Sequence, residues 1–379
     1  MSRVHLDHNA TTPLRPEARA ELMRSLDALG GNPSSVHTSG RAARAELDDA
    51  RERVAAALGV DGQELVFTSG GTEANNAALF GALPPDGALV ISAAEHSSVR
   101  EAGEVLRSAG RDVRIVSVDP EGRLDVPALE AALKDSPKGL LSCVGANNEL
   151  GAVAPFSKIR SALDSASHEA PLAWHADCVQ MLGKVPVRPR ALGLDLASFS
   201  SHKVGGPLGV GVLWCAKSLP FTPRMVGGGQ EGGLRSGTEN LPSIAAAAVA
   251  IELAVAEQAD YAARTRALTE ELWAGIEGAL PGARLVGPPV QSEARLPNTL
   301  CVLLPEADGR VLVPRLDLAG LEVSAGSACS SGSIEPSPVL LALGHDEADA
   351  RAALRLSLGR TTTREEVRSA IHTLGITCG

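Results

Sequence analysis

From residue 40 onward, short apolar runs alternate with stretches of helical periodicity. The helical stretches cover residues 41–58, 99–108, 126–133 and 156–165, and a further helix is expected to begin near Thr72. The apolar runs cover residues 64–68, 88–92, 113–118, 140–144, 172–175, 196–200 and 210–214. Short β-type runs separated by helices predict an α/β domain with a mainly parallel sheet, covered by helices on both faces.

The pattern changes after residue 240. An Ala-rich stretch at 241–280 predicts two helices or one long bent helix, and short strands at 298–304, 321–324 and 353–358 precede a last helix at 363–374. This order is typical of a smaller α+β domain. With 379 residues, 44% of them hydrophobic, the chain is large enough for two domains. We predict a large domain at 12–255 and a small domain formed by 1–11 and 256–379.

Composition excludes several classes of function. A formal net charge of −10 and 2% aromatic residues do not suit a nucleic-acid-binding surface. No apolar run reaches the roughly 18 residues of a membrane span, and the N-terminus lacks an apolar signal segment, so we expect a cytoplasmic protein. Six cysteines stand singly, without a Cys-x-x-Cys pair, so neither a disulfide framework nor a metal site is predicted.

Lys203 follows an apolar strand in the run Ser198–Lys203 and precedes Val204-Gly205-Gly206-Pro207. A lysine held at a strand end, beside Ser200 and His202, suits covalent attachment of a carbonyl-bearing cofactor whose phosphate binds to neighbouring donors. A surface lysine in a Gly-rich turn explains this motif equally well when it is considered alone.

Asp177 and Gln180 follow the run at 172–175. An aspartate at the carboxyl end of a parallel strand lies where α/β sheets bind ligands, and it can keep a pyridine nitrogen protonated. Gln180 can donate to a ring hydroxyl oxygen. The alternative is that Asp177 caps the following helix.

A third motif runs from Phe67 to Asn76 and combines a strand, a Gly-Gly turn and a helix start. Backbone N–H groups near Gly71 and Thr72 form a candidate phosphate site, although an ordinary capped turn fits as well. The motif is neither a Walker A loop nor a G-x-G-x-x-G fingerprint. His96 follows the next strand, where it can stack on a planar cofactor or serve as a structural hydrogen-bonding group.

Two further residues are singled out near the C-terminus. Cys329 lies in the small-residue run 324–333, which predicts an exposed, flexible loop where a thiol is useful as a nucleophile. Arg355 lies in Leu354-Arg355-Leu356-Ser357-Leu358, on the face opposite the leucines. An arginine on a packed strand suits a substrate carboxylate, and a surface salt bridge is the alternative.

Together these motifs resemble the cysteine desulfurase family, in the branch of the NifS and IscS proteins, and the resemblance runs nearly end to end. Further matching segments are Leu6–Pro13, Gly31–Ser35, Asn147–Gly151, Arg235–Thr238 and Glu335–Ser337.

The resemblance implies the aspartate-aminotransferase-like fold of PLP-dependent transferases, fold type I, and a homodimer. It implies that Lys203 binds pyridoxal 5'-phosphate and, once released, removes the substrate's α-proton. The other implied cofactor contacts come from Gly71, Thr72, His96, Asn148, Asp177, Gln180, Ser200, His202 and, reaching into the partner's site, Thr238. Asn148 and Arg355 orient the substrate carboxylate.

The implied reaction removes sulfur from L-cysteine, leaving L-alanine and a persulfide on Cys329, with His96 as a possible general base. The persulfide then passes to an acceptor protein or scaffold, for iron–sulfur cluster assembly or other sulfur metabolism. Selenocysteine lyase, an aminotransferase on the same fold and a non-catalytic sulfur-relay subunit remain as alternatives.

Three departures from the family pattern stand out. The usual histidine before the Asn147–Asn148 pair is replaced in the stretch 142–146, and Cys178 stands where alanine is common. We expect neither change to abolish activity. Because the sequence stops near Gly379, we expect the C-terminal extension by which IscS-like members dock a scaffold protein to be lacking, so the sulfur acceptor stays open.

Overall fold

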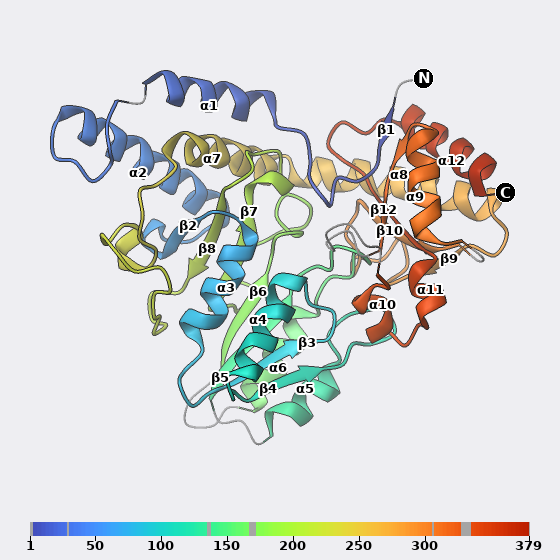
Figure 1. The fold of residues 1–379 in the computed structure, drawn as a ribbon, viewed down its shortest axis with the longest axis horizontal. Coiled ribbons are helices and arrows are strands. Elements are labelled where there is room, and N and C mark those ends of the chain that lie inside the picture. The colour runs from blue at the N-terminus through green and yellow to red at the C-terminus, as the bar shows by residue number, and fades with distance from the viewer. Residues whose placement is uncertain are drawn as a thin grey trace.

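The computed structural model describes residues 3–28, 30–134, 138–166, 172–304, 307–326 and 335–378. A seven-stranded sheet forms the centre of the larger part, in the order β2-β8-β7-β6-β5-β3-β4 (Figure 1). Only β8 runs antiparallel to its neighbours, and the other pairings are parallel. The strands are β2 (Leu65–Thr68), β3 (Ala88–Ser92), β4 (Val113–Val116), β5 (Gly139–Val144), β6 (Ala173–Asp177), β7 (Leu196–Ser200) and β8 (Gly211–Cys215). The predicted mainly parallel α/β sheet is therefore confirmed.

Helices cover both faces of this sheet because neighbouring strand residues point to opposite sides. Leu140 packs in a core with helices α3 and α4, whereas the next residue, Leu141, packs with α2, α5, α6 and α7. Helix α1 packs on α7. The helices are α1 (Pro16–Ala28), α2 (Thr38–Leu58), α3 (Gly71–Ala82), α4 (Ser97–Ser108), α5 (Val126–Leu133), α6 (Phe156–Ser165) and α7 (Leu241–Ala256). Three short 3-10 helices are also described: η1 (Gly62–Glu64), η2 (Ser201–Lys203) and η3 (Glu231–Gly233).

The smaller part is built on a four-stranded antiparallel sheet, in the order β12-β13-β10-β9. Its strands are β9 (Arg284–Val286), β10 (Thr299–Leu303), β12 (Ser324–Ala325) and β13 (Ala353–Ser357). Near it, β1 (Val4–His5) pairs in parallel with β11 (Leu321–Glu322), which brings the N-terminal segment to this part of the molecule. Its helices are α8 (Gln258–Ala279), α9 (Gly309–Leu318), α10 (Pro338–Ala342), α11 (Glu347–Arg351) and α12 (Arg364–Cys378).

The Ala-rich stretch forms two helices, α7 and α8, which meet at an angle of 67°. No single helix in the described parts of the chain is long and apolar enough to cross a membrane. The two helices satisfy that criterion only when they are taken together, and most of α7 is buried in the protein core.

The arrangement brings the carboxyl ends of β5, β6 and β7 to one edge of the large sheet. The chain segment that follows β1 passes this edge, since Asn9 donates a hydrogen bond to the Asn148 carbonyl and accepts one from Gln180. The same Asn9 side chain contacts Thr299 at the start of β10. The edge of the large sheet, the N-terminal segment and the small sheet therefore meet around one site.

Candidate active site

A cavity of about 290 Å³ lies where these three parts meet. It is large enough for a small cofactor and substrate. All predicted site residues except Thr238 and Cys329 line it: Gly71, Thr72, His96, Asn148, Asp177, Gln180, Ser200, His202, Lys203 and Arg355. Their positions in the sequence span more than 280 residues, so the fold brings together side chains that the sequence keeps far apart.

Lys203 is the last residue of η2, which directly follows β7. Its Nζ donates to the backbone oxygens of Asn9 and Ala10, both at 2.7 Å. The side chain is half-buried. It lines the cavity, as attachment to a cofactor requires. At Gly205 the backbone has a φ of +84°, and a side chain there would be strained and would meet Arg15.

His202 precedes the lysine and faces the same cavity. Its Nδ1 lies 3.1 Å from the Thr11 hydroxyl. Burial, and then the neighbouring charge of Lys203, lower the pKa of His202 to about 4. Without a bound anion the imidazole is therefore uncharged at neutral pH, and a phosphate beside it would favour the protonated ring.

Asp177 is the last residue of β6 and is buried. Its Oδ1 accepts a hydrogen bond from the Val179 backbone N–H at 3.0 Å, and its Oδ2 accepts one from Asn75 Nδ2 at 2.7 Å. Asn75 also donates to Ser98 Oγ, and among the described residues its buried Oδ1 has no partner. Asn75 thus fixes the carboxylate, a role that the sequence analysis did not assign.

Helix α3 begins at Gly71, and the preceding cap residue, Gly70, offers no side-chain hydrogen bond to its first N–H groups. A Cβ on Gly71 would lie 2.9 Å from Val179 Cγ2, so a residue larger than glycine would not fit here unless its surroundings shifted. Backbone N–H groups at a helix start attract anions. Together with Thr72 and Ser200, which line the same cavity, they form a cradle that fits a phosphate group.

His96 caps the start of α4. Its Nδ1 accepts a hydrogen bond from the Ser98 backbone N–H at 3.2 Å and lies 2.8 Å from Ser98 Oγ. Because Nδ1 accepts from a backbone N–H, a neutral His96 carries its proton on Nε2. The donor of the neutral ring is therefore Nε2–H, and the ring lines the cavity.

Arg355, on β13, is 1% exposed. Its Nη2 donates to Asp7 Oδ1 at 2.6 Å, and its Nη1 donates to the Asn148 carbonyl at 3.3 Å. Within the described residues its buried Nε has no hydrogen-bond partner. The salt bridge that the sequence left as an alternative therefore exists, but it lies at the cavity and not at the surface. A carboxylate in the cavity can approach this guanidinium.

Two predicted residues lie elsewhere. Thr238 is exposed, outside the cavity, at the end of the Gly-rich segment 227–238. Cys329 lies outside the described residues. Four of the other cysteines are buried: Cys143, Cys178, Cys215 and Cys301. Burial raises the pKa of each of these thiols, which makes them poor nucleophiles. The described part of the chain holds no cluster of His, Cys, Asp and Glu suited to a metal ion.

Two charged residues near the site had no predicted role. Glu149 is buried beside Asn148 and accepts a hydrogen bond from Ser337 Oγ. Burial raises its pKa to about 7, although the Ser337 hydrogen bond and then the charge of Arg355 oppose the shift. Lys184 is buried with 4% of its surface exposed, and its amine contacts Gln180. Glu149 lies in the matching segment Asn147–Gly151, whereas Lys184 lies among apolar residues and glycine, where the sequence gives no signal of a role.

Comparison with known proteins identifies the family. The model of the aminotransferase class-V family matches residues 4–369. A cysteine desulfurase of Cereibacter sphaeroides is 42% identical over 99% of this chain and 95% of its own length. The cysteine desulfurase IscS of Dictyoglomus turgidum is 39% identical over 98% of this chain and 93% of its own.

Solved structures agree with the sequence relatives. A NifS-like protein superposes with a TM-score of 0.90 and 34% identity, covering 99% of this chain and 98% of that protein. The chain therefore belongs to the aminotransferase class-V family. This family and its cysteine desulfurase members depend on pyridoxal phosphate, so the predicted cofactor and the predicted fold type I are confirmed.

Proposed function

We propose that this protein is a pyridoxal-phosphate-dependent cysteine desulfurase, which converts L-cysteine to L-alanine and leaves the sulfur as a persulfide on Cys329. The observation that carries the proposal is the single cavity that joins Lys203, Asp177 and Arg355. A lysine for covalent attachment, a carboxylate for a ring nitrogen and a guanidinium for a substrate carboxylate are the groups that this reaction on an amino acid needs.

The residues present fit the cofactor. The open start of α3, with Thr72, Ser200 and His202, would hold its phosphate, and Asp177 would pair with its ring nitrogen. Gln180 would donate to the ring hydroxyl oxygen, and His96 would lie against the ring. When bound, pyridoxal phosphate supplies an electron sink that stabilises negative charge at the substrate's α-carbon.

Lys203 would act as the base that removes the α-proton. Two backbone carbonyls hold its Nζ at the cavity, so the amine keeps a defined position when it is not covalently bound. Arg355, with the nearby Asn148, would orient the substrate carboxylate and thereby place the α-proton toward Lys203. His96, with its proton on Nε2, would act on the substrate as a hydrogen-bond donor.

The sulfur transfer needs a thiolate. An ordinary thiol has a pKa of about 8.5, so a minor fraction is ionised at neutral pH. Approach to the cationic groups of the cavity would raise the ionised fraction. The Cys329 sulfur attacks the cysteine sulfur, an S–S bond forms, and the substrate C–S bond breaks. The electron pair of that bond stays with carbon, which takes up a proton and becomes the methyl group of alanine. The persulfide then passes to an acceptor protein.

The proposal includes a homodimer that acts in the cytoplasm. Exposed apolar side chains near Thr238 support the dimer, since Val226 is 78% exposed and Met225 is 44% exposed. Residues of this kind are commonly covered by a partner. In the dimer, Thr238 would reach the phosphate cradle of the other subunit. The sulfur acceptor would be a protein of iron–sulfur cluster assembly or of another sulfur pathway.

Three measurements test the proposed activity. Purified protein should be yellow, and borohydride reduction should fix the cofactor on Lys203, as shown by peptide mass spectrometry. L-cysteine should give equal amounts of alanine and, with a thiol reductant, sulfide. Treatment with L-cysteine alone should add one sulfur atom to the peptide that contains Cys329.

The control is Cys329→Ser, which should remain yellow and release essentially no sulfide. A serine variant that desulfurates at a comparable rate would falsify the assigned nucleophile. Label on another lysine would overturn the cofactor assignment. Formation of a keto acid in place of alanine would indicate an aminotransferase, and a strong preference for selenocysteine over cysteine would indicate a selenocysteine lyase.

A further inference from the structure

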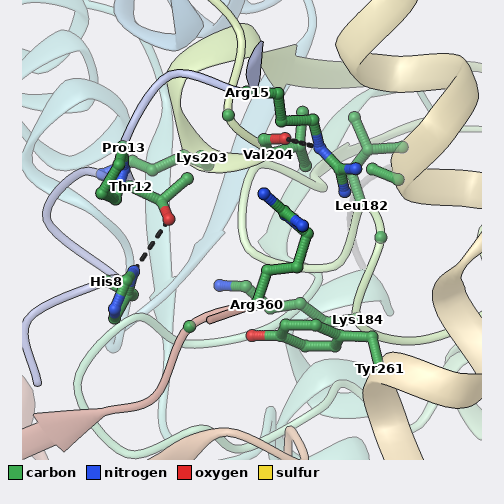
Figure 2. A pocket seen from close by; sticks show the side chains of 14 residues that line it. His8, Thr12, Pro13, Arg15, Leu182, Lys184, Lys203, Val204, Tyr261 and Arg360 are labelled. Atoms are coloured by element: carbon green, nitrogen blue, oxygen red, sulfur yellow. Dashed lines mark hydrogen bonds between the residues drawn. The ribbon is translucent and has the colours of Figure 1, made fainter. Parts of the chain in front are cut away.

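Lys184 contacts Gln180 but does not itself line the cavity of about 290 Å³. It follows Gln180 by four residues on the turn after β6, and its side chain is 4% exposed. Lys184 and Lys203 both line a second, smaller cavity of about 40 Å³, which Figure 2 shows together with Arg15, Tyr261 and Arg360. Burying a lysine costs free energy unless its amine has partners, so its contacts are informative.

The Lys184 amine has two oxygen partners. It donates to the side-chain oxygen of Gln180, Oε1, and to that of Asn9, Oδ1, the second at 2.9 Å. No carboxylate in the described ranges forms an ion pair with it. Burial, and then the charge of Lys203, lower the pKa of Lys184 well below its ordinary value. An amine keeps at least two N–H groups in either protonation state, so both contacts persist.

These contacts determine how the side-chain amides of Gln180 and Asn9 are oriented. An amide side chain carries an oxygen that accepts and a nitrogen that donates, and turning it over exchanges the two. Lys184 donates to Gln180 Oε1, so Gln180 Nε2 must point the other way. There Nε2 donates to the Asn9 backbone oxygen at 3.0 Å, beside the cavity that Gln180 lines.

The backbone oxygen of Asn9 strengthens the arrangement because it also accepts from Lys203 Nζ at 2.7 Å. The Asn9 side chain is fixed in the same way. Its Oδ1 accepts from Lys184 and Asn298, while its Nδ2 donates to Thr299 Oγ1 at 2.9 Å. Lys184 is thus the shared donor to two amides that lie around the cofactor lysine.

We infer that Lys184 is a positioning residue that holds the Gln180 amide with Nε2 toward the cofactor cavity, where it donates to the ring oxygen of the cofactor. The inference rests on the proposed function, in which Gln180 binds that oxygen. Without Lys184, and among the described residues, only the hydrogen bond from Nε2 to the Asn9 backbone oxygen favours the native orientation. When the amide turns over, its carbonyl oxygen would face an oxygen of the cofactor. Two facing acceptors repel, whereas the native arrangement is a hydrogen bond.

The test compares Lys184→Met with Gln180→Ala and with the double variant, all loaded with pyridoxal phosphate. Methionine keeps the length of the buried chain and removes the donors. Lys158→Met, on an exposed position of α6, is the matched control. The measurements are the cofactor dissociation constant and the pH midpoint of its visible absorbance, which responds to hydrogen bonding at the ring oxygen. Circular dichroism checks folding.

We expect Lys184→Met to raise the dissociation constant about tenfold, which corresponds to about 1.4 kcal/mol. The pH midpoint should rise by about one unit, because loss of a donor destabilises the negatively charged ring oxygen. In the Gln180→Ala background the same substitution should change neither quantity further, because Lys184 acts through Gln180. If Lys184→Met does not fold, Lys184→Gln is measured in the same two backgrounds.

An equal shift in both backgrounds would overturn the inference, because it would show a direct effect of the lost positive charge on Lys203. An unchanged midpoint in Lys184→Met would overturn it as well. Failure of the proposed function would give a different result, because the wild-type protein itself would then carry no cofactor on Lys203. That result would also overturn the inference.

Discussion

Arg355 Nη2 donates to Asp7 Oδ1 at 2.6 Å, and this ion pair connects β13 to the N-terminal segment. Two residues further along that segment, the backbone oxygen of Asn9 accepts a hydrogen bond from Lys203. The group proposed to bind the substrate carboxylate and the lysine proposed to bind the cofactor are therefore anchored to the same short stretch of chain. A shift of this stretch would move both together.

Replacing Arg355 with alanine should raise the KM for cysteine much more than it lowers kcat. A charge-assisted hydrogen bond to a carboxylate contributes about 1.5–3 kcal/mol, which corresponds to roughly 10- to 150-fold in KM. Steady-state kinetics with L-cysteine measure the effect, and the cofactor's absorbance shows whether the site stays loaded. Arg351→Ala, in which a partly exposed ion pair with Glu347 is lost, is the matched control. Unchanged saturation by cysteine would leave Arg355 with a structural role alone.

Asn75→Ala should weaken cofactor binding, because Asn75 fixes one oxygen of Asp177. A side-chain hydrogen bond to a carboxylate in a buried site is worth about 1.5–3 kcal/mol, so the dissociation constant should rise at least tenfold. Equilibrium dialysis against pyridoxal phosphate measures it. Within the described parts of the chain, the neighbouring Asn76 donates only to backbone oxygens of Thr72 and Ser98, so Asn76→Ala is the control. Similar losses in both variants would show a general effect on α3.

Much of the fold follows from periodicity. The apolar runs at 88–92, 140–144 and 196–200 are strong signals because these strands are buried on both faces, and they agree with β3, β5 and β7. Helix α1 carries no comparable signal and is not predicted from the sequence. Of its residues only Ala18 and Ser25 are buried, so it has hardly any apolar stripe to recognise.

The candidate site is predictable where function demands a residue type at a strand or helix end, as at Lys203, Asp177 and Gly71. The supporting residues are not. Lys184 and Glu149 are charged, and nothing in a single sequence shows that the fold buries them. Asn9 lies in the matching segment Leu6–Pro13, but its contacts with Lys203, Gln180 and Thr299 depend on how three distant segments meet. The local sequence does not show which distant segments come into contact in the folded chain.

Thr238→Ala should weaken cofactor retention without reducing the thermal stability of the apoprotein. Thr238 is exposed in the single chain, so its loss leaves no cavity within the subunit. In the proposed dimer it contributes a hydroxyl group to the partner's phosphate cradle. Cofactor dissociation rates and sedimentation analysis test both points. A stable monomer that retains the cofactor fully would rule out the shared site.

Glu149 should make the stability of the protein depend on pH. Burial raises the pKa of Glu149 to about 7 in the folded protein, from an ordinary value of 4.5. Between these values the folded state holds a proton that the unfolded state has lost, so the free energy of unfolding falls as the pH rises. The full shift corresponds to about 3 kcal/mol, present below pH 4.5 and lost above about pH 7.

The comparison of wild-type protein with Glu149→Gln isolates this effect, because glutamine keeps an acceptor for Ser337 Oγ and does not titrate. The free energies of unfolding of the two proteins should differ least near pH 5. Between pH 5 and pH 8 the value for the variant should exceed that of the wild type by a growing amount. Urea unfolding at several pH values measures the difference, in which contributions from buried histidines such as His175 cancel. Glu130→Gln, at an exposed position of α5, should show no such trend. A constant difference between wild type and Glu149→Gln across this range would mean that Glu149 is ionised throughout, with its charge stabilised by Arg355.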